Sequence, residues 1–144
     1  MTKIYLDNAA TTPLAPEAFD AMLPYLKEHF GNPSAIHAYG RKTRAAVEQA
    51  RRTVAHLLHC APGEIIFTSG GTEADNMVLN GAVRDLGVKH IITSPIEHHA
   101  VELTAHALWH TGTQVHWLRL ESDGKPEVAH LEELLKATQG QGVL

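Results

Sequence analysis

A glycine-rich stretch, Thr68–Asn76 (TSGGTEADN), lies between a short apolar run and a helical pattern that starts at Thr72. Gly70 and Gly71 carry no Cβ, so the backbone can turn tightly there and come close to a ligand. The free N–H groups of the first helical turn suit an anion such as a phosphate. The stretch therefore predicts a phosphate cradle. The alternative is that Thr72 only caps the helix, with Asp75 completing a capping-box-like pair.

Three other segments carry residues that could take part in chemistry. They are Tyr5–Thr12 (YLDNAATT), Gly31–Ser34 with His37 (GNPSAIH) and Glu97–Ala100 (EHHA). Each is expected in a loop at or beside a strand end, where ligands of open α/β sheets bind, so the glycine turn and the EHHA turn can face one pocket. A histidine there can stack on an aromatic cofactor and pass protons at neutral pH, although a structural histidine is the alternative.

Short β-like runs alternate with amphipathic helices from residue 64 onward, which predicts an α/β fold with a mostly parallel sheet flanked by helices. The expected strands are Glu64–Thr68, His90–Thr93 and Gln114–Leu120, and the expected helices are Thr72–Leu86, His98–Thr111 and Glu127–Thr138. Gly87 and Gly112 occupy positions typical of helix C-termini. Upstream we expect a strand at Ile4–Leu6, helices at about Pro16–His29 and Gly40–Leu58, and a loop at Phe30–Ser34.

The amino-acid composition limits the classes of protein to which this chain can belong. The 144 residues are 44% hydrophobic, which predicts one soluble globular domain, and no run is long enough to span a bilayer. The net charge of −4 argues against a general nucleic-acid binder. The N-terminus lacks the features of a signal peptide, and the single Cys60, expected to be a buried structural thiol, cannot form an internal disulfide. A cytoplasmic protein is expected.

Two charged or histidine-rich groups have other possible uses. One group is a basic cluster of Arg41, Lys42, Arg44, Arg51 and Arg52. Because Glu48 lies four residues from both Arg44 and Arg52, we expect this cluster to be solvated or to face a partner. The eleven histidines suggest a different class of function, a metal-binding or interaction module. Its ligands would share one helix face and are His99, Glu102, His106 and His110.

Four motifs together resemble a known family. YLDNAATTP, GNPS followed by His37 and Gly40-Arg41, TSGGTEADN, and the strand followed by EHHA occur in this order and at similar spacing in cysteine desulfurases. These are pyridoxal-phosphate enzymes of fold-type I in the class V aminotransferase group. The resemblance extends over essentially the whole chain. The GNPS and TEADN forms are more similar to the nitrogen-fixation and iron-sulfur-cluster branch.

The resemblance implies roles for individual residues. Gly71 and Thr72 would hold the cofactor phosphate, and His98 would stack on the pyridine ring as a cofactor-binding and catalytic residue. The segment that lines the substrate side of the pocket in the family contains Asn8, Ala9 and Thr11. A loop that approaches the active site and the dimer partner contains Asn32 and His37.

The family also needs residues that this chain lacks. The lysine that binds the cofactor as a Schiff base, in a Ser-x-His-Lys motif, and the cysteine that accepts sulfur lie beyond residue 144 in family members. Residues 1–144 would therefore be the N-terminal arm and the first part of the large domain, without the rest of the catalytic domain and the small C-terminal domain. Val143 and Leu144 resemble the start of a buried strand, so we expect a piece of a longer protein that is inactive alone.

The function implied by the resemblance is conversion of L-cysteine to L-alanine with pyridoxal 5'-phosphate, leaving a persulfide for iron-sulfur cluster or thio-cofactor synthesis. The implied partners are a sulfur acceptor or iron-sulfur scaffold protein and a second copy of the chain in a homodimer, with neither nucleic acid nor membrane. Selenocysteine lyase or another class V aminotransferase is an alternative enzyme. The metal-binding or interaction module is the alternative of another class.

Overall fold

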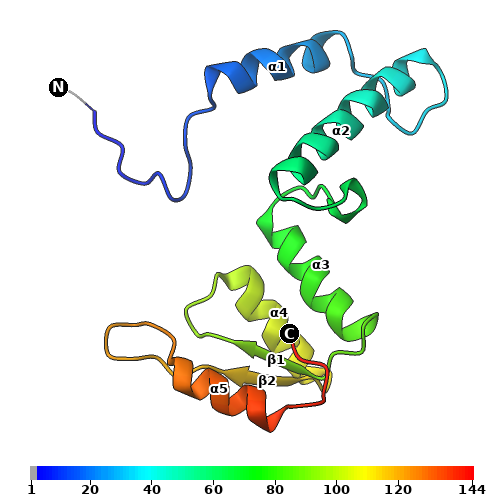
Figure 1. The fold of residues 1–144 in the computed structure, drawn as a ribbon. Coiled ribbons are helices and arrows are strands. Elements are labelled where there is room, and N and C mark those ends of the chain that lie inside the picture. Colours follow the sequence, from blue (N-terminus) through cyan, green and yellow to red (C-terminus); the bar gives the residue numbers. More distant parts are fainter. Residues whose placement is uncertain (1–2) are drawn as a thin grey trace. The chain divides into compact units, whose positions relative to one another are not determined.

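The structure, a computed structural model, describes residues 3–144, so the first two residues of the predicted N-terminal arm lie outside it. The described chain divides between Ile66 and Phe67 into two compact units. Figure 1 shows the elements along the chain. No helix within residues 3–144 is long and apolar enough to cross a lipid bilayer.

The N-terminal unit contains the helices α1 (Pro16–Lys27) and α2 (Ala38–Leu57) and the short 3-10 helix η1 (Pro62–Glu64). Both predicted helices are confirmed. Pro16 opens α1 because its fixed φ suits the first helical position, where no N–H partner is needed. Cys60 follows α2 and is half-buried, with its amide donating to the Ala55 carbonyl at 3.0 Å.

The loop before α2 is held tightly against the first turn of that helix. A Cβ on Gly31 would lie 2.5 Å from the carbonyl carbon of Tyr39, so the close approach of two backbone segments requires glycine. From the basic cluster, Arg44 donates to the Pro33 carbonyl at 2.8 Å. Glu48 pairs with Arg51 at 3.1 Å, and not with the two arginines expected at a spacing of four residues.

Two predicted strands are wrong. Residues 4–6 and 65–68 form no strand, and Glu64 belongs to η1. Both segments have the residue types of a strand, and Leu6 is 87% exposed. A strand also needs the hydrogen-bond ladder of a neighbouring strand, and neither segment is part of such a ladder within residues 3–144.

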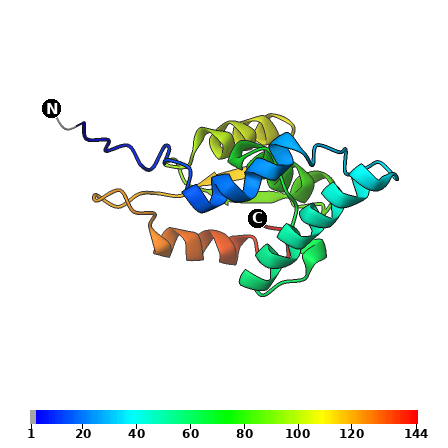
Figure 2. The same cartoon turned by 90° about the horizontal axis from the view of Figure 1, so that it is seen from above.

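The C-terminal unit alternates helices and strands: α3 (Gly71–Arg84), β1 (His90–Thr93), α4 (His99–His110), β2 (Gln114–Trp117) and α5 (Val128–Ala137). β1 and β2 pair in parallel, with His90 opposite Gln114 and Thr93 opposite Trp117. The views in Figures 1 and 2 place α4 and α5 on opposite sides of this sheet. The predicted α/β fold with a parallel sheet is confirmed.

A small apolar cluster holds this unit together. Leu79 of α3, Ile91 of β1 and Leu108 of α4 form its centre, with half-buried valines packed against them. Ile91 is 2% exposed and is the largest fully buried side chain in the described part of the chain. The α4 residues that face inward recur every four positions or so, as expected for one face of a helix. This packing positions the N-terminal ends of α3 and α4.

The sheet gains a third chain segment at the end of the sequence. Val143 forms a parallel bridge with His90, and the Leu144 amide donates to the His90 carbonyl at 3.0 Å. The strand-like start expected there is confirmed as a pairing, but Leu144 is exposed and not buried. The predicted strand to Leu120 ends earlier, at Trp117, because β1 ends at Thr93 and offers no further partner.

Candidate functional site

Helix α3 starts at the glycine-rich stretch, as the phosphate-cradle prediction requires. Gly70 precedes the first helical residue and has an extended backbone, and no side chain caps the helix. Thr72 lies inside the helix at its second position. The alternative interpretation, in which Thr72 caps the helix, is therefore wrong.

The first turn of α3 leaves hydrogen-bond donors free. The amides of Gly71, Thr72 and Glu73 donate to no acceptor among the described residues, whereas the Ala74 amide bonds the Gly70 carbonyl at 3.2 Å. A Cβ built on Gly71 would meet no protein atom within 4 Å. Gly71 has no positive φ, so within the described residues the space beside it is open to a ligand.

Glu73 folds back onto the glycine-rich stretch. The backbone amide and the hydroxyl of Ser69 each donate to Oε2 of Glu73 at 2.6 Å. These hydrogen bonds, that of the hydroxyl first, lower the pKa of the Glu73 carboxyl below its ordinary value. Glu73 is therefore ionised at neutral pH and engaged with Ser69.

His98 occupies the position before the first residue of α4. Its Nδ1 accepts a hydrogen bond from the Ala100 amide at 3.1 Å. Because an amide N–H can only donate, Nδ1 must carry the lone pair and the proton of the neutral ring lies on Nε2. The turn before it is fixed by the buried Ser94, whose hydroxyl donates to Oε1 of Glu97 at 3.0 Å. His98 therefore presents Nε2 as the nitrogen that can exchange a proton.

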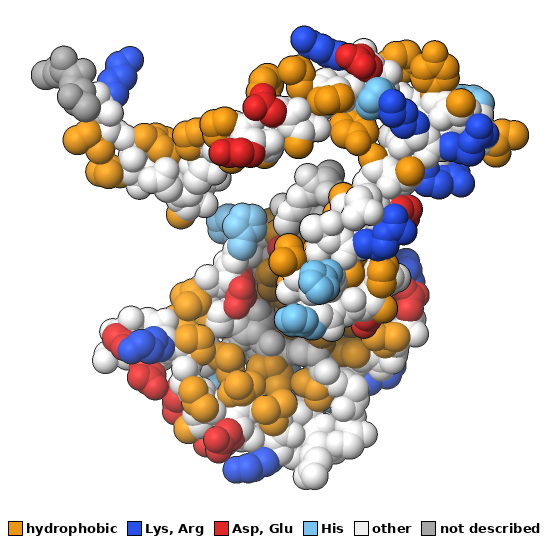
Figure 3. All heavy atoms as spheres, turned by 45° about the horizontal axis from the view of Figure 1, so that its top comes forward, with side chains coloured by type: hydrophobic (Ala, Val, Ile, Leu, Met, Phe, Trp, Pro, Cys, Tyr) orange, Lys and Arg blue, Asp and Glu red, His pale blue; other side chains and the backbone are white. Residues whose placement is uncertain are grey.

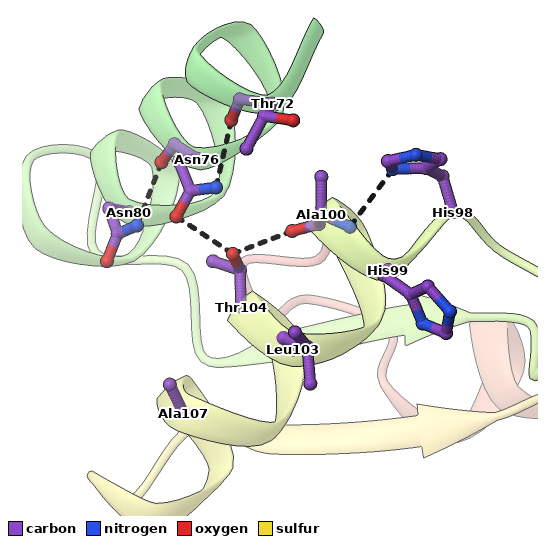
Figure 4. A pocket seen from close by; sticks show the side chains of 9 residues that line it. All are labelled: Thr72, Asn76, Asn80, His98, His99, Ala100, Leu103, Thr104 and Ala107. Carbon is purple, nitrogen blue, oxygen red and sulfur yellow. Dashed lines mark hydrogen bonds between the residues drawn. The ribbon is translucent and has the colours of Figure 1, made fainter. Parts of the chain in front are cut away.

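Thr72 and His98 line one open pocket of about 520 Å³ between α3 and α4. Figure 4 shows the N-terminal turns of both helices at the same end of this pocket. Its other lining residues are Asn76, Asn80, His99, Ala100, Leu103, Thr104 and Ala107. Gly71 is adjacent to Thr72 in the chain but does not line the pocket. The structure thus brings together two of the three residues predicted to bind the cofactor.

The other predicted site residues belong to the N-terminal unit. Residues 8–10 form a turn, and the hydroxyl of Thr11 lies 2.5 Å from that of Tyr5. Asn8, Ala9 and Thr11 are exposed.

Asn32 and His37 have local structural contacts in the N-terminal unit. Oδ1 of Asn32 accepts from the Ser34 amide at 2.8 Å, and Nδ1 of His37 accepts from the Gly40 amide at 3.4 Å. His37 therefore caps α2 in the same manner as His98 caps α4. A role of these two residues at an active site stays a prediction.

The histidines of α4 do not assemble a metal site. Nδ1 of His99 lies 3.0 Å from Oε2 of Glu102. The rings of His106 and Trp117 contact each other in a tilted arrangement, as do those of His110 and Trp109. Within residues 3–144 no group of three histidine, cysteine or acidic side chains is placed to hold a metal ion. The described residues therefore provide no set of ligands for the alternative of a metal-binding module.

Three polar residues of the pocket, Asn76, Asn80 and Thr104, were missed from the sequence. Asn76 lies one helical turn after Thr72, and Thr104 lies one turn after Ala100, so each shares a helix face with a first-turn residue. That spacing of four residues was a usable signal. Their contact with each other, at 2.9 Å between Oγ1 of Thr104 and Oδ1 of Asn76, depends on how α3 packs on α4 and has no signal in the sequence.

Known proteins are similar to this chain in sequence and in structure. The pattern of the aminotransferase class V family matches residues 4–140. The chain belongs to this family. A cysteine desulfurase IscS of Dictyoglomus turgidum is 47% identical over 136 residues, which cover 93% of this chain and 34% of that protein. A putative cysteine desulfurase IscS 1 of Bacillus subtilis is 44% identical over 139 residues, covering 94% and 36%.

Solved structures agree with the sequence comparisons. The structure of a NifS-like protein matches with a TM-score of 0.87 and 35% identity, over 92% of this chain and 37% of that one. These neighbours are fold-type I enzymes, which confirms the predicted fold class. This chain spans about a third of the length of the curated relatives that it matches.

Class V aminotransferases use pyridoxal 5'-phosphate, and the residues of the pocket fit that group. Three free amides and the Thr72 hydroxyl at a helix N-terminus suit the dianionic phosphate, and the space over Gly71 is open. An exposed imidazole on the same pocket suits the aromatic ring. These groups are chemically compatible with the cofactor that the family uses.

Proposed function

We propose that this chain is the N-terminal third of a cytoplasmic, homodimeric cysteine desulfurase. The whole protein would convert L-cysteine to L-alanine and transfer sulfur, as a persulfide, to an acceptor or iron-sulfur scaffold protein. The observation that carries the proposal is the single pocket lined by Thr72 at the start of α3 and His98 at the start of α4. The names of the relatives, cysteine desulfurases from several organisms, support the choice of reaction within the family.

Each of these residues would have its own role when pyridoxal 5'-phosphate is bound. The first-turn amides of α3 and the Thr72 hydroxyl bind the phosphate, with the positive end of the helix dipole adding to the attraction. His98 lies against the ring and holds or moves a proton at Nε2, because Nδ1 is engaged by the Ala100 amide. The bound cofactor supplies an electron sink. The lysine and the sulfur-accepting cysteine would belong to the remaining two thirds of the protein.

Replacement of His98 in the protein made from its native gene tests the reaction. We expect His98→Gln to lower kcat for alanine release from L-cysteine by about 100-fold or more, the range typical of lost proton transfer. His110→Gln, at the exposed far end of α4, is the matched control and should keep wild-type turnover. Wild-type kcat in His98→Gln would contradict the assignment.

A second variant separates cofactor binding from folding. Because a Cβ on Gly71 meets no protein atom within 4 Å, Gly71→Ala should leave the melting temperature of the cofactor-free protein unchanged or higher. It should weaken binding of pyridoxal 5'-phosphate by about tenfold or more, the loss expected from about 1.4 kcal/mol of contact. Unchanged affinity, measured by titration of the visible absorbance, would exclude the glycine-rich stretch as the phosphate site.

Two related activities remain as alternatives within the family. A selenocysteine lyase would show a higher kcat/KM for L-selenocysteine than for L-cysteine. Another class V aminotransferase would transfer the amino group of its substrate to a keto acid, and would release no alanine from L-cysteine and form no protein persulfide. Parallel assays of both substrates, with mass spectrometry of the protein for an added sulfur atom, distinguish the three activities.

A further inference from the structure

A set of close polar contacts connects the two ends of the pocket, in which two acceptors, Oδ1 of Asn76 and the Ala100 carbonyl, share the one proton of the Thr104 hydroxyl (Figure 4). Nδ2 of Asn76 donates to the Thr72 carbonyl at 2.9 Å, and Oδ1 of Asn76 lies 2.9 Å from the Thr104 hydroxyl. The same hydroxyl lies 2.7 Å from the Ala100 carbonyl, and the Ala100 amide donates to Nδ1 of His98 at 3.1 Å. The path starts at the phosphate-binding turn and ends at the histidine.

The central link of this path lies between the helices. Thr104 is 7% exposed, and its contact with Asn76 is the one hydrogen bond between side chains of α3 and α4 within the described residues. The apolar contacts between these helices, which include Leu79 and Leu108, are not directional. A buried hydrogen bond has a fixed length and direction, so it sets how far one helix can shift along the other.

The chemistry of both side chains also argues for a positioning role. Both polar atoms of the Asn76 amide and the Thr104 hydroxyl have partners inside the protein, so none of them depends on a ligand. A valine at position 104 would fill the same volume and avoid burying a hydroxyl, so apolar packing alone does not explain threonine there. The hydroxyl does explain a fixed separation of the first turns of α3 and α4.

We propose that Asn76 and Thr104 are positioning residues that hold Thr72 and His98 at the separation needed to grip the phosphate and the ring of one cofactor molecule. This inference rests on the proposed function, because it concerns how pyridoxal 5'-phosphate is held. Asn76 keeps the first turn of α3 closed through the Thr72 carbonyl. Thr104 ties that turn to the first turn of α4, which carries His98.

Thr104→Val in the full protein made from its native gene is the direct test. Its affinity for pyridoxal 5'-phosphate should fall by between about twofold and tenfold, the effect of one net hydrogen bond. The circular dichroism of the bound cofactor should also change, since that signal reports the setting of the ring. Thr104→Ser keeps the hydroxyl and should restore both.

Thr138→Val is the matched control. Thr138 is buried and its hydroxyl donates to the Leu134 carbonyl of its own helix at 2.8 Å, four residues back, as Thr104 does with Ala100. Within residues 3–144, its hydroxyl makes no hydrogen bond to another helix. Its loss should lower the melting temperature while cofactor affinity and dichroism stay at wild-type values.

Asn76→Ala provides a second variant at a half-buried position, and it keeps the test decisive if Thr104→Val does not accumulate. It should weaken cofactor binding by a similar factor, and the double variant should be no weaker than the single ones, since both remove one link. Wild-type affinity and dichroism in Thr104→Val or Asn76→Ala, or additive losses, would overturn the inference alone. Failure of the wild-type protein to bind pyridoxal 5'-phosphate would overturn the proposed function and the inference with it.

Discussion

A pair of histidines, one buried and one half-buried, connects the two strands of the C-terminal unit. His90 of β1 is 4% exposed, and its Nδ1 lies 3.0 Å from Nε2 of His116 on β2, with the rings stacked. Nε2 of His90 contacts Oε1 of Gln141 at 2.5 Å. Since the Gln141 oxygen only accepts, His90 carries its proton on Nε2 and accepts from His116. This pair connects both strands with the segment that leads to Val143.

The pair predicts a specific dependence of stability on pH. Burial first, and then the neighbouring His90 and His130, lower the pKa of His116 below its ordinary value of 6.5. The unfolded chain therefore binds the proton at a higher pH than the folded one, so the free energy of unfolding is unaffected well above 6.5 and falls as the pH decreases through 6.5 toward the lowered pKa. Melting temperatures measured across this range should decline toward acid.

Substitution of His116 identifies the group responsible. His116→Gln should flatten the acid decline of the melting temperature, whereas His110→Gln, exposed on α4, should retain it. An equal decline in wild type and His116→Gln would assign the pH dependence to other groups.

At the scale of elements, the end of α4 shows why helix boundaries could be predicted. The Gly112 amide donates to the Trp109 carbonyl at 3.0 Å and the Thr113 amide to the Leu108 carbonyl at 3.1 Å. These two bonds form a Schellman motif, which needs a residue with positive φ, and Gly112 has a φ of 103°. The glycine expected at the helix C-terminus is confirmed at this position.

Two glycine-to-alanine variants of the same unit should have opposite effects. Gly112→Ala forces a side chain into a left-handed conformation and should destabilise the protein by about 1–2 kcal/mol. Gly81→Ala lies within α3, where the nearest atom to a new Cβ is Oδ2 of Asp85 at 3.8 Å, so it should stabilise by up to about 1 kcal/mol. Denaturant unfolding of both variants measures the difference. A shift of the same sign in both would contradict the capping role.

The elements that sequence reasoning recovered are those whose determinants are local. All five α-helices within residues 3–144 were predicted, because amphipathic spacing and terminal residues lie within each helix. The strand at His90–Thr93 was predicted with its observed bounds. The prediction of strands at residues 4–6 and 64–68 was wrong, because the hydrogen bonds of a strand depend on a partner strand that is distant in the sequence.

The same distinction applies to the site. Thr72 and His98 were identified from motifs, and the pocket that contains both is consistent with them. The link between Asn76 and Thr104 joins residues 28 positions apart and arises only when α3 packs on α4. Periodicity within one helix carries no information on that contact.

At the scale of the whole molecule, the chain exposes much of its apolar surface. Helix α1 contains no buried residue, although Phe19, Met22 and Leu26 are spaced as one apolar face. In the C-terminal unit, Met77 and Leu86 border an open apolar pocket. Figure 3 shows hydrophobic side chains spread over the visible surface. Monomeric soluble proteins rarely leave such surfaces uncovered.

This exposure predicts association of the 144-residue polypeptide. We expect its sedimentation coefficient to rise with concentration and its surface to bind a hydrophobic fluorescent dye, because each apolar contact removes about 25 cal/mol of unfavourable hydration per Å². A polypeptide of the length of the curated relatives should show weaker dye binding, since the added residues would cover part of this surface.

The paired variant Phe19→Ser and Met22→Ser should reduce association without lowering the melting temperature, as neither side chain is buried. A 144-residue polypeptide that stays monomeric at all concentrations and binds no dye would show that these apolar faces are not adhesive in solution.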